Sequence, residues 1–527
     1  MQESLQKIVQ GTNFTGFDWG IVAVYLAISV AVGILARRYV ADMADYVVAG
    51  RGIRTALGIA TLTGTELGLV TVMYNAEKGF NGGFAAFHIG LAAGVVAFFV
   101  GVTGFIIASL RRHEVLTIPE FYGKRFGKRT RVLGGIILAL GGILNMGMFL
   151  KAGSIFIVGI TGLPAEGAAL FIVMFVLLAL VLFYTVLGGM VSVVLTDYVQ
   201  FVVLSFGLLL ATGLAIMKLG WANIFTSIIE LKGEAGFNPL VAEGAFGPDY
   251  VVWMAFLGIV NCALWPTAVT RALACESEAV VKRQFTCGAF AFAIRVIVPS
   301  FWGICALVLI AQTPALTPAF APEIIKAEPY TAWYAMPVFL GRVLPVGLIG
   351  IITAAMIAAF MSTHDSYFLC WSSVITNDVA VPLMRKPLSQ RAQVTLARVL
   401  ILVIGVLIFL ISFLFPIRED LWDYMAVTGA IYFSGAFAVL VGGLYWRRAS
   451  STGAVLAMIA GCFAVFGLEA IQKGIASASE KLLGRNLDGL MGALTGARVG
   501  LAVVSLAVVA MVAGSLLFPD KKAAEEG

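Results

Sequence analysis

Residues 55–78 read TALGIATLTGTELGLVTVMYNAEK, an apolar run whose part 57–68 contains three glycines, three threonines and one carboxylate, Glu66. The run is long enough to cross about 30 Å of hydrocarbon as a helix. The glycines and hydroxyl residues at its centre predict a helix that is interrupted near Gly64. Irregular backbone is tolerated inside a bilayer only where it lines a cavity, so this stretch predicts a membrane protein with an internal site.

The composition of the whole chain also requires a membrane. The 527 residues are 60% hydrophobic and 12% charged, and the mean hydropathy is +0.98. A water-soluble chain of this size could not bury so much apolar surface. The apolar runs are about 20 residues long, unlike the short alternating segments of a transmembrane barrel. We therefore predict an all-α integral membrane protein.

The apolar runs predict about thirteen transmembrane spans, of which the first is an uncleaved span rather than a signal peptide. They are expected at 17–36, 55–78, 83–110, 131–160, 165–188, 194–218, 249–271, 284–312, 340–380, 392–416, 420–446, 451–472 and 496–518.

The basic residues predict how these spans are oriented. With the N-terminus outside, the cytoplasmic side holds about twice as many Lys and Arg as the opposite side, as the positive-inside rule requires. The loops expected there are 37–54, 111–131, 271–283, 385–398 and 447–448, and the C-terminal tail follows an odd number of spans. The net charge of +6 is scattered over these loops, so it reports topology and gives no sign of a nucleic-acid partner.

The chain reads as one membrane domain without a soluble module. Spans 2 to 6 and 7 to 11 could form two five-helix halves of opposite orientation, because an odd number of helices inverts the second copy. Span 7 has a matching irregularity at Asn261, Trp265 and Pro266. The expected organisation is an N-terminal flanking helix and first cytoplasmic loop (1–54), a core (55–446, halves 55–218 and 249–446), and two flanking helices with a short tail (447–527).

Span 9 carries a polar cluster in which Ser362, Thr363 and Ser366 share or adjoin one helix face. Their hydroxyls could complete the oxygen shell of a cation, together with backbone carbonyls freed at the break in span 2. Equally, each hydroxyl could bond the carbonyl four residues back, as happens freely in membrane helices. The six cysteines show neither metal spacing nor a disulfide framework.

Charged residues within spans cost roughly 2.5–3.5 kcal/mol each on insertion scales, so each needs an explanation. Asp197 could cap its helix or reach the interface, and Lys151 and Arg295 could reach the headgroups or pair with a carboxylate across the bundle. Glu66 adjoins the predicted break, so we expect it to contact an ion, a substrate or an internal basic partner. Asp365 is the fifth such charge.

The sequence YTVLGGMVS at 184–192, leading into LTDYVQ at 195–200, resembles the most specific motif of the sodium:solute symporter family. Similar stretches are DYVVAGR (45–51), TIPEF (117–121) with RFG (125–127), TRALA (270–274), MST (361–363), and WRR (446–448) with GA (453–454). Only the termini fall outside this resemblance. It implies a LeuT-type inverted-repeat core in spans 2 to 11, with one flanking helix before it and two after it.

The resemblance also implies where sodium would bind. In the main site the ligands would be the carbonyls of Gly64, Leu67 and Ala359 and the side chains of Ser362 and Thr363. Some family members bind a second sodium ion closer to the cytoplasm. The matching residues for that ion are Asp197 and Ser366, with Thr363 shared between the two sites.

The solute is expected beside the main ion, where side chains of the interrupted helices and their neighbours could reach it. The candidates are Thr65, Glu66, His88, Lys151, Asn261, Trp265, Tyr424 and Thr428. Family members that carry sugars or proline have a different residue at the position of Glu66, so neither specificity transfers to this chain. Lys151 could receive a substrate carboxylate or neutralise Glu66.

The implied function is sodium-coupled import of a small polar organic solute by alternating access, with no enzymatic activity. A proton-coupled or ion-independent carrier, with Glu66 or Asp365 as the titrating group, is the alternative within transport. A membrane sensor with a transporter-like fold is the alternative from another class, although no signalling domain is present. The expected location is a plasma membrane, the inner membrane of a bacterium, and lipid is the surrounding partner.

Overall fold

The computed structural model describes residues 2–36, 48–165, 168–241, 244–327, 331–386, 388–414, 420–483 and 486–520. These residues form helices and short connections, with no strand among them and one isolated bridge between Ile53 and Cys275. Nine helical segments of this described part are long and apolar enough to cross a membrane, or ten if one bent pair forms a single span. The all-α membrane architecture is confirmed, whereas the number of thirteen spans is not.

The first half of the core begins with an interrupted span. Its helices are α4 (Thr55–Glu66), α5 (Leu69–Gly82), α6 (Phe87–Thr103), α7 (Ile107–Arg112), α8 (Ile118–Phe126), α9 (Lys128–Met146), α10 (Phe149–Thr161) and α11 (Ala168–Leu219). The predicted span 131–160 is divided between α9 and α10. From residue 168 on, the predicted spans 165–188 and 194–218 both fall within α11, which continues without interruption over 52 residues.

The second half also begins with an interrupted span. Its helices are α13 (Pro248–Ala263), α14 (Pro266–Leu273), α15 (Glu278–Ala311), α17 (Ala332–Val343), α18 (Leu348–Val374), the π-helical η7 (Ile375–Ala380), α19 (Val381–Leu383), α20 (Gln390–Leu414) and α21 (Leu421–Tyr445). The predicted span 340–380 is therefore not one helix. It starts in α17, and α18 begins only after a break at residues 344–347.

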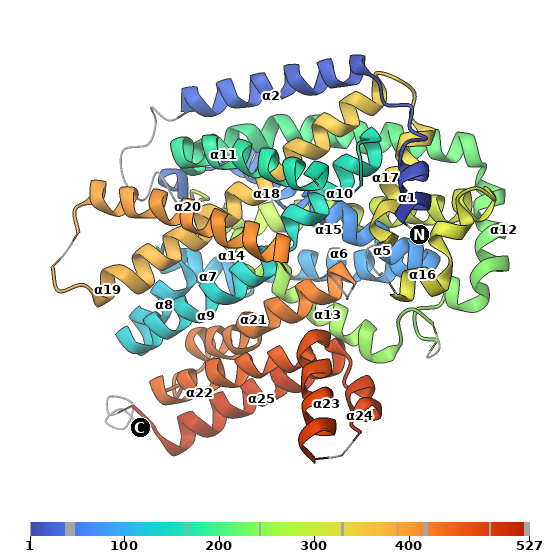
Figure 1. The fold of residues 1–527 in the computed structure, drawn as a ribbon. Helices are drawn as coiled ribbons and strands as arrows, with labels where there is room; N and C mark the ends of the chain where they lie inside the picture. The colour runs from blue at the N-terminus through green and yellow to red at the C-terminus, as the bar shows by residue number, and fades with distance from the viewer. Residues whose placement is uncertain are drawn as a thin grey trace.

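The remaining helices surround this core. They are α1 (Gln2–Val9), α2 (Gly16–Ala36), α12 (Trp221–Lys232), α16 (Pro322–Ala327), α22 (Ser451–Cys462), α23 (Glu469–Leu483), α24 (Asp488–Ala493) and α25 (Gly496–Leu517). In Figure 1, α2 lies along one edge of the molecule and α22 to α25 along the opposite edge. The predicted span 451–472 bends by 77° between residues 467 and 469.

Helix α18 is the centre of the packing that positions the site. Every residue from Ile352 to Val374 is buried, as expected of a helix enclosed on all sides. Helices α4, α5, α11 and α14 all pack against it. The two interrupted spans and α11 thus meet around the hydroxyl-bearing part of α18.

Candidate functional site

Each of the two interrupted spans contains a short non-helical stretch inside the core. Helix α4 ends at Glu66, and Leu67 (φ −94°, ψ 59°) and Gly68 (φ −78°, ψ 161°) separate it from α5. Between α13 and α14, Trp265 is extended (φ −68°, ψ 124°), because the residue before a proline is disfavoured in a helix. The break predicted at Trp265 and Pro266 is confirmed. The first break lies three residues later than the predicted position.

The two glycines of α4 and its break have different roles. Gly64 is helical, and a Cβ there would lie 3.0 Å from the carbonyl oxygen of Asp197 on α11. Gly68 lies in the break itself, where a Cβ would overlap the hydroxyl of Thr363 on α18 and come within 3.2 Å of its Cβ. The absence of a side chain at Gly64 therefore permits close helix packing, while that at Gly68 lets the interrupted backbone reach α18.

Backbone oxygens at this break are left free. The amide of Leu67 donates to Thr63 O at 2.9 Å, and the amide of Val72 donates to Gly68 O at 3.1 Å. Within the described part of the chain, no backbone amide donates to the carbonyl oxygens of Gly64 or Leu67. Buried carbonyls without partners are costly, so these two suit a hard cation such as sodium as a ligand.

The hydroxyls predicted to face this break lie beside it. Thr363 Oγ1 donates to Ala359 O at 2.9 Å, and the hydroxyl of Ser362 donates to the carboxylate of Asp197. A serine or threonine hydroxyl that donates its proton still has lone pairs on its oxygen, and these can bind a cation. The alternative, a hydrogen bond to the carbonyl four residues back, is thus found for Thr363 and also for Ser366, whose Oγ donates to Ser362 O at 2.9 Å, but it leaves the lone pairs of both hydroxyls available.

Asp197 is the centre of a fully buried polar cluster that includes an arginine. Its Oδ2 accepts from Thr61 Oγ1 at 2.6 Å, Thr65 Oγ1 at 3.0 Å and Arg271 Nη2 at 3.3 Å. Arg271 Nη2 also donates to Ser366 Oγ at 2.6 Å. The guanidinium therefore lies between the two residues that match the second sodium site.

This position of Arg271 corrects one prediction. The residue was expected in the cytoplasmic loop 271–283, as part of the positive charge that sets topology. It instead belongs to the last turn of α14, and its side chain is completely buried. The carboxylate of Asp197 offsets the free-energy cost of burying the guanidinium, because a buried charge needs a partner of opposite sign.

Glu66 has the internal basic partner that was expected for it, and this partner is Arg295 of α15. Arg295 Nη1 donates to the carboxylate of Glu66 and, at 3.1 Å, to its backbone oxygen. Thr71 Oγ1 donates to the same backbone oxygen at 3.1 Å. The pair thus closes the end of α4 and neutralises both charges.

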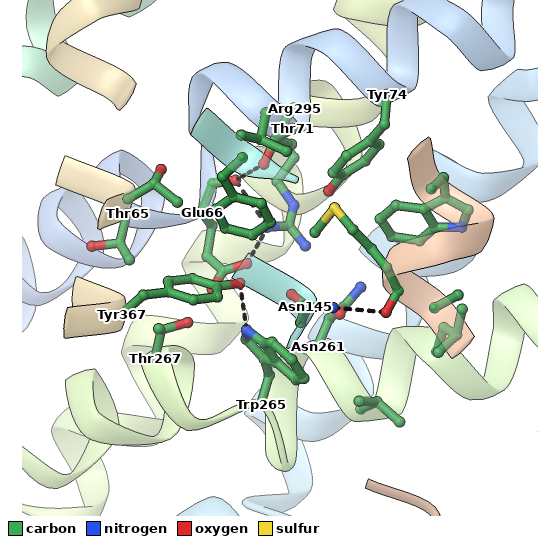
Figure 2. Close-up of a pocket in the computed structure, with 18 of the residues that line it drawn as sticks. Thr65, Glu66, Thr71, Tyr74, Asn145, Asn261, Trp265, Thr267, Arg295 and Tyr367 are labelled. Atoms are coloured by element: carbon green, nitrogen blue, oxygen red, sulfur yellow. Dashed lines mark hydrogen bonds and ion pairs between the residues drawn. The ribbon is translucent and has the colours of Figure 1, made fainter. Parts of the chain in front are cut away.

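A cavity of about 60 Å³, partly open to solvent, lies between the two breaks. Its polar lining comes from Thr65, Glu66, Thr71, Tyr74, Asn145, Asn261, Thr267, Arg295, Thr363 and Tyr367. Figure 2 shows Glu66 and Arg295 pointing toward each other, with Tyr74, Tyr367 and Trp265 around the same space. The indole of Trp265 donates to the hydroxyl of Tyr367 at 2.8 Å. A lining with this many polar groups suits a small polar solute.

Four of the eight predicted solute residues line this cavity, namely Thr65, Glu66, Asn261 and Trp265. The other four, His88, Lys151, Tyr424 and Thr428, are not among its lining residues. His88 Nδ1 lies 2.6 Å from Ala85 O, and Tyr424 donates to Leu144 O at 2.8 Å. Thr428 accepts from Asn145 Nδ2 at 3.1 Å and so acts from behind the lining.

Sequence reasoning missed several residues of the cavity wall. Asn145, Tyr74 and Phe149 carry no local signal, since each lies in an ordinary apolar run, and Trp422 stands among the charged residues at the start of its span. Arg295 was recognised as a charge that needed explaining but was not assigned to the site. Asp365, a predicted titrating group, is buried on α18 and hydrogen-bonds the hydroxyl of Thr185.

Comparison with known proteins identifies relatives along nearly the whole chain. The model of the sodium:solute symporter family matches residues 46–461. A sodium/glucose cotransporter of Vibrio parahaemolyticus is 24% identical, with 88% of this chain and 86% of the relative covered. A sodium/proline symporter of Haemophilus influenzae is 25% identical, with 86% of this chain and 88% of the relative covered.

The fold is shared with a solved transporter. The structure of a substrate-bound, outward-open Na⁺-coupled sialic acid symporter superposes with a TM-score of 0.76 at 20% identity. The match covers 96% of this chain and all of that one. It bears out the LeuT-type architecture expected from the sequence.

Proposed function

Because the chain belongs to the sodium:solute symporter family, we propose that it imports a small polar organic solute together with sodium by alternating access. The observation that carries this proposal is the contact between the break at Leu67 and Gly68 and the hydroxyl face of α18. Free carbonyls on one side and hydroxyls on the other supply oxygen ligands for sodium. The cavity beside them, which Thr363 also lines, would hold the solute.

The proposed main sodium site consists of the carbonyl oxygens of Gly64, Leu67 and Ala359 and the hydroxyls of Ser362 and Thr363. An ion held there would join the interrupted span to α18. Since α18 is enclosed in the core, an ion that joins the interrupted span to α18 favours the conformation in which these two elements are in contact. Sodium from outside would thus favour the outward-open state, and its release inside would free the solute.

The sodium gradient supplies enough free energy for accumulation. One charge crossing about 100 mV contributes roughly 2.3 kcal/mol, and a tenfold gradient adds about 1.4 kcal/mol. Together they would support accumulation of a neutral solute by roughly several hundredfold per sodium ion. A second ion would roughly square this limit.

We further propose that a second sodium ion binds at Asp197 and Ser366, with Thr363 shared between the two sites. Three hydroxyls donate to the carboxylate of Asp197, and their oxygens together with the carboxylate favour a cation there. The guanidinium of Arg271 already contacts both Asp197 and Ser366. An ion would therefore have to displace Arg271 from between them.

We also propose the plasma membrane as the location, with the N-terminus outside and the C-terminus in the cytoplasm. The named relatives include bacterial transporters, which supports the inner membrane of a bacterium. The arrangement of charged loops described from the sequence gives the orientation.

The test is uptake by proteoliposomes under separate sodium and pH gradients, with the double variant Ser362→Ala/Thr363→Ala beside the wild type. We expect sodium-driven uptake in the wild type and its loss in the variant, because two oxygen ligands are removed. Uptake driven by a pH gradient alone would favour the proton-coupled alternative. Unchanged sodium dependence in the variant would count against the proposed ion site.

A further inference from the structure

The cavity contains one positive and one negative side chain. Glu66 and Arg295 are the charged residues of its lining within the described part of the chain, and only 10% and 6% of their side chains are exposed. Their charges cancel, so the empty cavity has no net charge. A solute with a net charge would leave that charge uncompensated at low dielectric, which is unfavourable. The lining therefore selects solutes whose net charge is zero.

The guanidinium of Arg295 keeps donors that the ion pair does not use. Its Nη1 serves the carboxylate and the backbone oxygen of Glu66, and its Cζ lies 4.4 Å from the centre of the Phe292 ring. Its Nε is buried and has no hydrogen-bond partner. A guanidinium carries five N–H donors in a plane that matches a carboxylate. The unused donors are suited to an anionic group of the solute.

Asn145 of α9 offers the complementary group. Its Nδ2 donates to Met425 O at 2.8 Å and to Thr428 Oγ1 at 3.1 Å. Since a backbone carbonyl can only accept, the amide nitrogen must face Met425, and this fixes the oxygen on the other side. That Oδ1 is buried and has no partner. A solute N–H donor would satisfy it.

The aromatic wall favours a cationic group near this acceptor. Tyr74, Trp422 and Phe433 line the same cavity, and their ring faces attract ammonium groups. The carboxylate of Glu66 adds a formal negative charge. A cationic group of the solute would thus meet a carboxylate, an amide oxygen and aromatic rings.

Resting on the proposed function, we propose that the solute is a small zwitterion of the amino-acid or betaine type. Its carboxylate binds Arg295, and its nitrogen cation binds near Glu66, Asn145 and the aromatic rings. A polyol could use the same hydrogen bonds, but it would not need a charged pair that is expensive to place inside a membrane. The one negative charge of Glu66 and the one positive charge of Arg295 instead match the two opposite charges of a zwitterion.

The test measures the Tm of the purified full-length protein in sodium chloride or potassium chloride. The probes are the twenty protein amino acids and glycine betaine, with D-glucose and myo-inositol as neutral polyols. For each amino acid that raises Tm, its amide serves as a matched cation and its N-acetyl derivative as a matched anion. We expect a sodium-dependent rise with at least one zwitterion, and at least tenfold weaker apparent affinity for its two derivatives.

Two single variants test the assignment of charges. Glu66→Gln leaves the cavity with a positive charge, so we expect its preference to move toward the N-acetyl anion. Arg295→Gln leaves a negative charge, so its preference should move toward the amide cation. If either variant fails to fold, the double variant Glu66→Gln/Arg295→Gln tests the assignment instead. It has no charged pair in the cavity, so we expect its affinity for the zwitterion to fall at least tenfold.

The outcomes separate this inference from the proposed function. A wild type that is stabilised by sodium but by no zwitterion, or by a polyol alone, overturns the substrate class and leaves sodium coupling standing. Unchanged zwitterion affinity in the variants also overturns it. If sodium itself gives no stabilisation and drives no uptake, the proposed function fails.

Discussion

At the scale of single residues, the pair of Asp197 and Arg271 makes a sharp prediction about stability. Both side chains are completely buried, and the carboxylate also accepts from three hydroxyls. Arg271→Gln removes the opposite charge beside the buried carboxylate of Asp197, and Asp197→Asn removes the opposite charge beside the buried guanidinium of Arg271. Each is expected to cost about 3–5 kcal/mol. Thermal unfolding of the purified variants, followed by the apparent Tm, measures this loss.

The double variant Arg271→Gln/Asp197→Asn is the control for this prediction. It removes both charges, so it should be less destabilised than the sum of the two single variants. Additive losses would contradict the pairing. The sodium activation curve of uptake tests the second ion in the same proteins. A Hill coefficient above one that Asp197→Asn lowers to one would support it, whereas a hyperbolic wild-type curve would oppose it.

The sequence indicated which buried charges needed partners but not which partners they had. Glu66 stood out because it adjoins a break in an apolar run. Its partner Arg295 lies more than two hundred residues away, and no local pattern connects the two. Arg271 was misread because an arginine at the end of a predicted span resembles an ordinary loop charge. Only the packing of α14 against α4 and α18 shows that it points inward.

At the scale of helices, Gly68 tests how the interrupted span reaches α18. Its φ and ψ are accessible to alanine, so a substitution there acts through space and not through backbone strain. The added methyl group would overlap Thr363 and separate the break from α18. Gly68→Ala is therefore expected to reduce sodium-dependent uptake at least tenfold and to destabilise the protein by about 1–3 kcal/mol.

Gly213→Ala is the matched control in α11. A Cβ at Gly213 would meet no atom within 4 Å, so uptake and Tm should match those of the wild type. If Gly68→Ala behaved like this control, the proposed contact between the break and α18 would be wrong.

The existence of the breaks was more predictable than their exact place. Trp265 and Pro266 marked the second break correctly, because proline restricts the residue before it. In the first span, the sequence did not distinguish Gly58, Gly64 and Gly68, and the break lies three residues beyond Gly64, near which it was predicted. What distinguishes these glycines is the neighbour each one meets, which is a tertiary property.

At the scale of the whole molecule, the two ends of the chain are predicted to lie on opposite sides of the membrane. Figure 1 places the marked N- and C-termini toward opposite ends of the roughly parallel helices. Cysteines introduced one at a time at Gln10 and Arg448 test the orientation in a Cys287→Ser/Cys462→Ser background, since Cys287 and Cys462 are the two native thiols that are not buried. A membrane-impermeant maleimide should label Gln10→Cys in intact cells. Arg448→Cys should react only after permeabilisation, and the reverse pattern would contradict the proposed topology.

Composition and apolar run length were sufficient to predict a helical membrane protein, because no other fold can place so much apolar surface. The number and bounds of the spans were harder to predict than the fold class. Residues 168–219 form the single helix α11, and 340–380 is divided between two helices and a π-helical turn. Local hydropathy does not show where neighbouring helices force or prevent a break.

The most direct test of the account is the binding of radiolabelled sodium to the purified protein. The wild type should bind sodium saturably without any solute, since the carbonyls at the break and the hydroxyls of α18 form the site by themselves. Ser362→Ala/Thr363→Ala should lose this binding while keeping its fold, as checked by size-exclusion chromatography. Equal sodium binding by the folded double variant and the wild type would contradict the central claim.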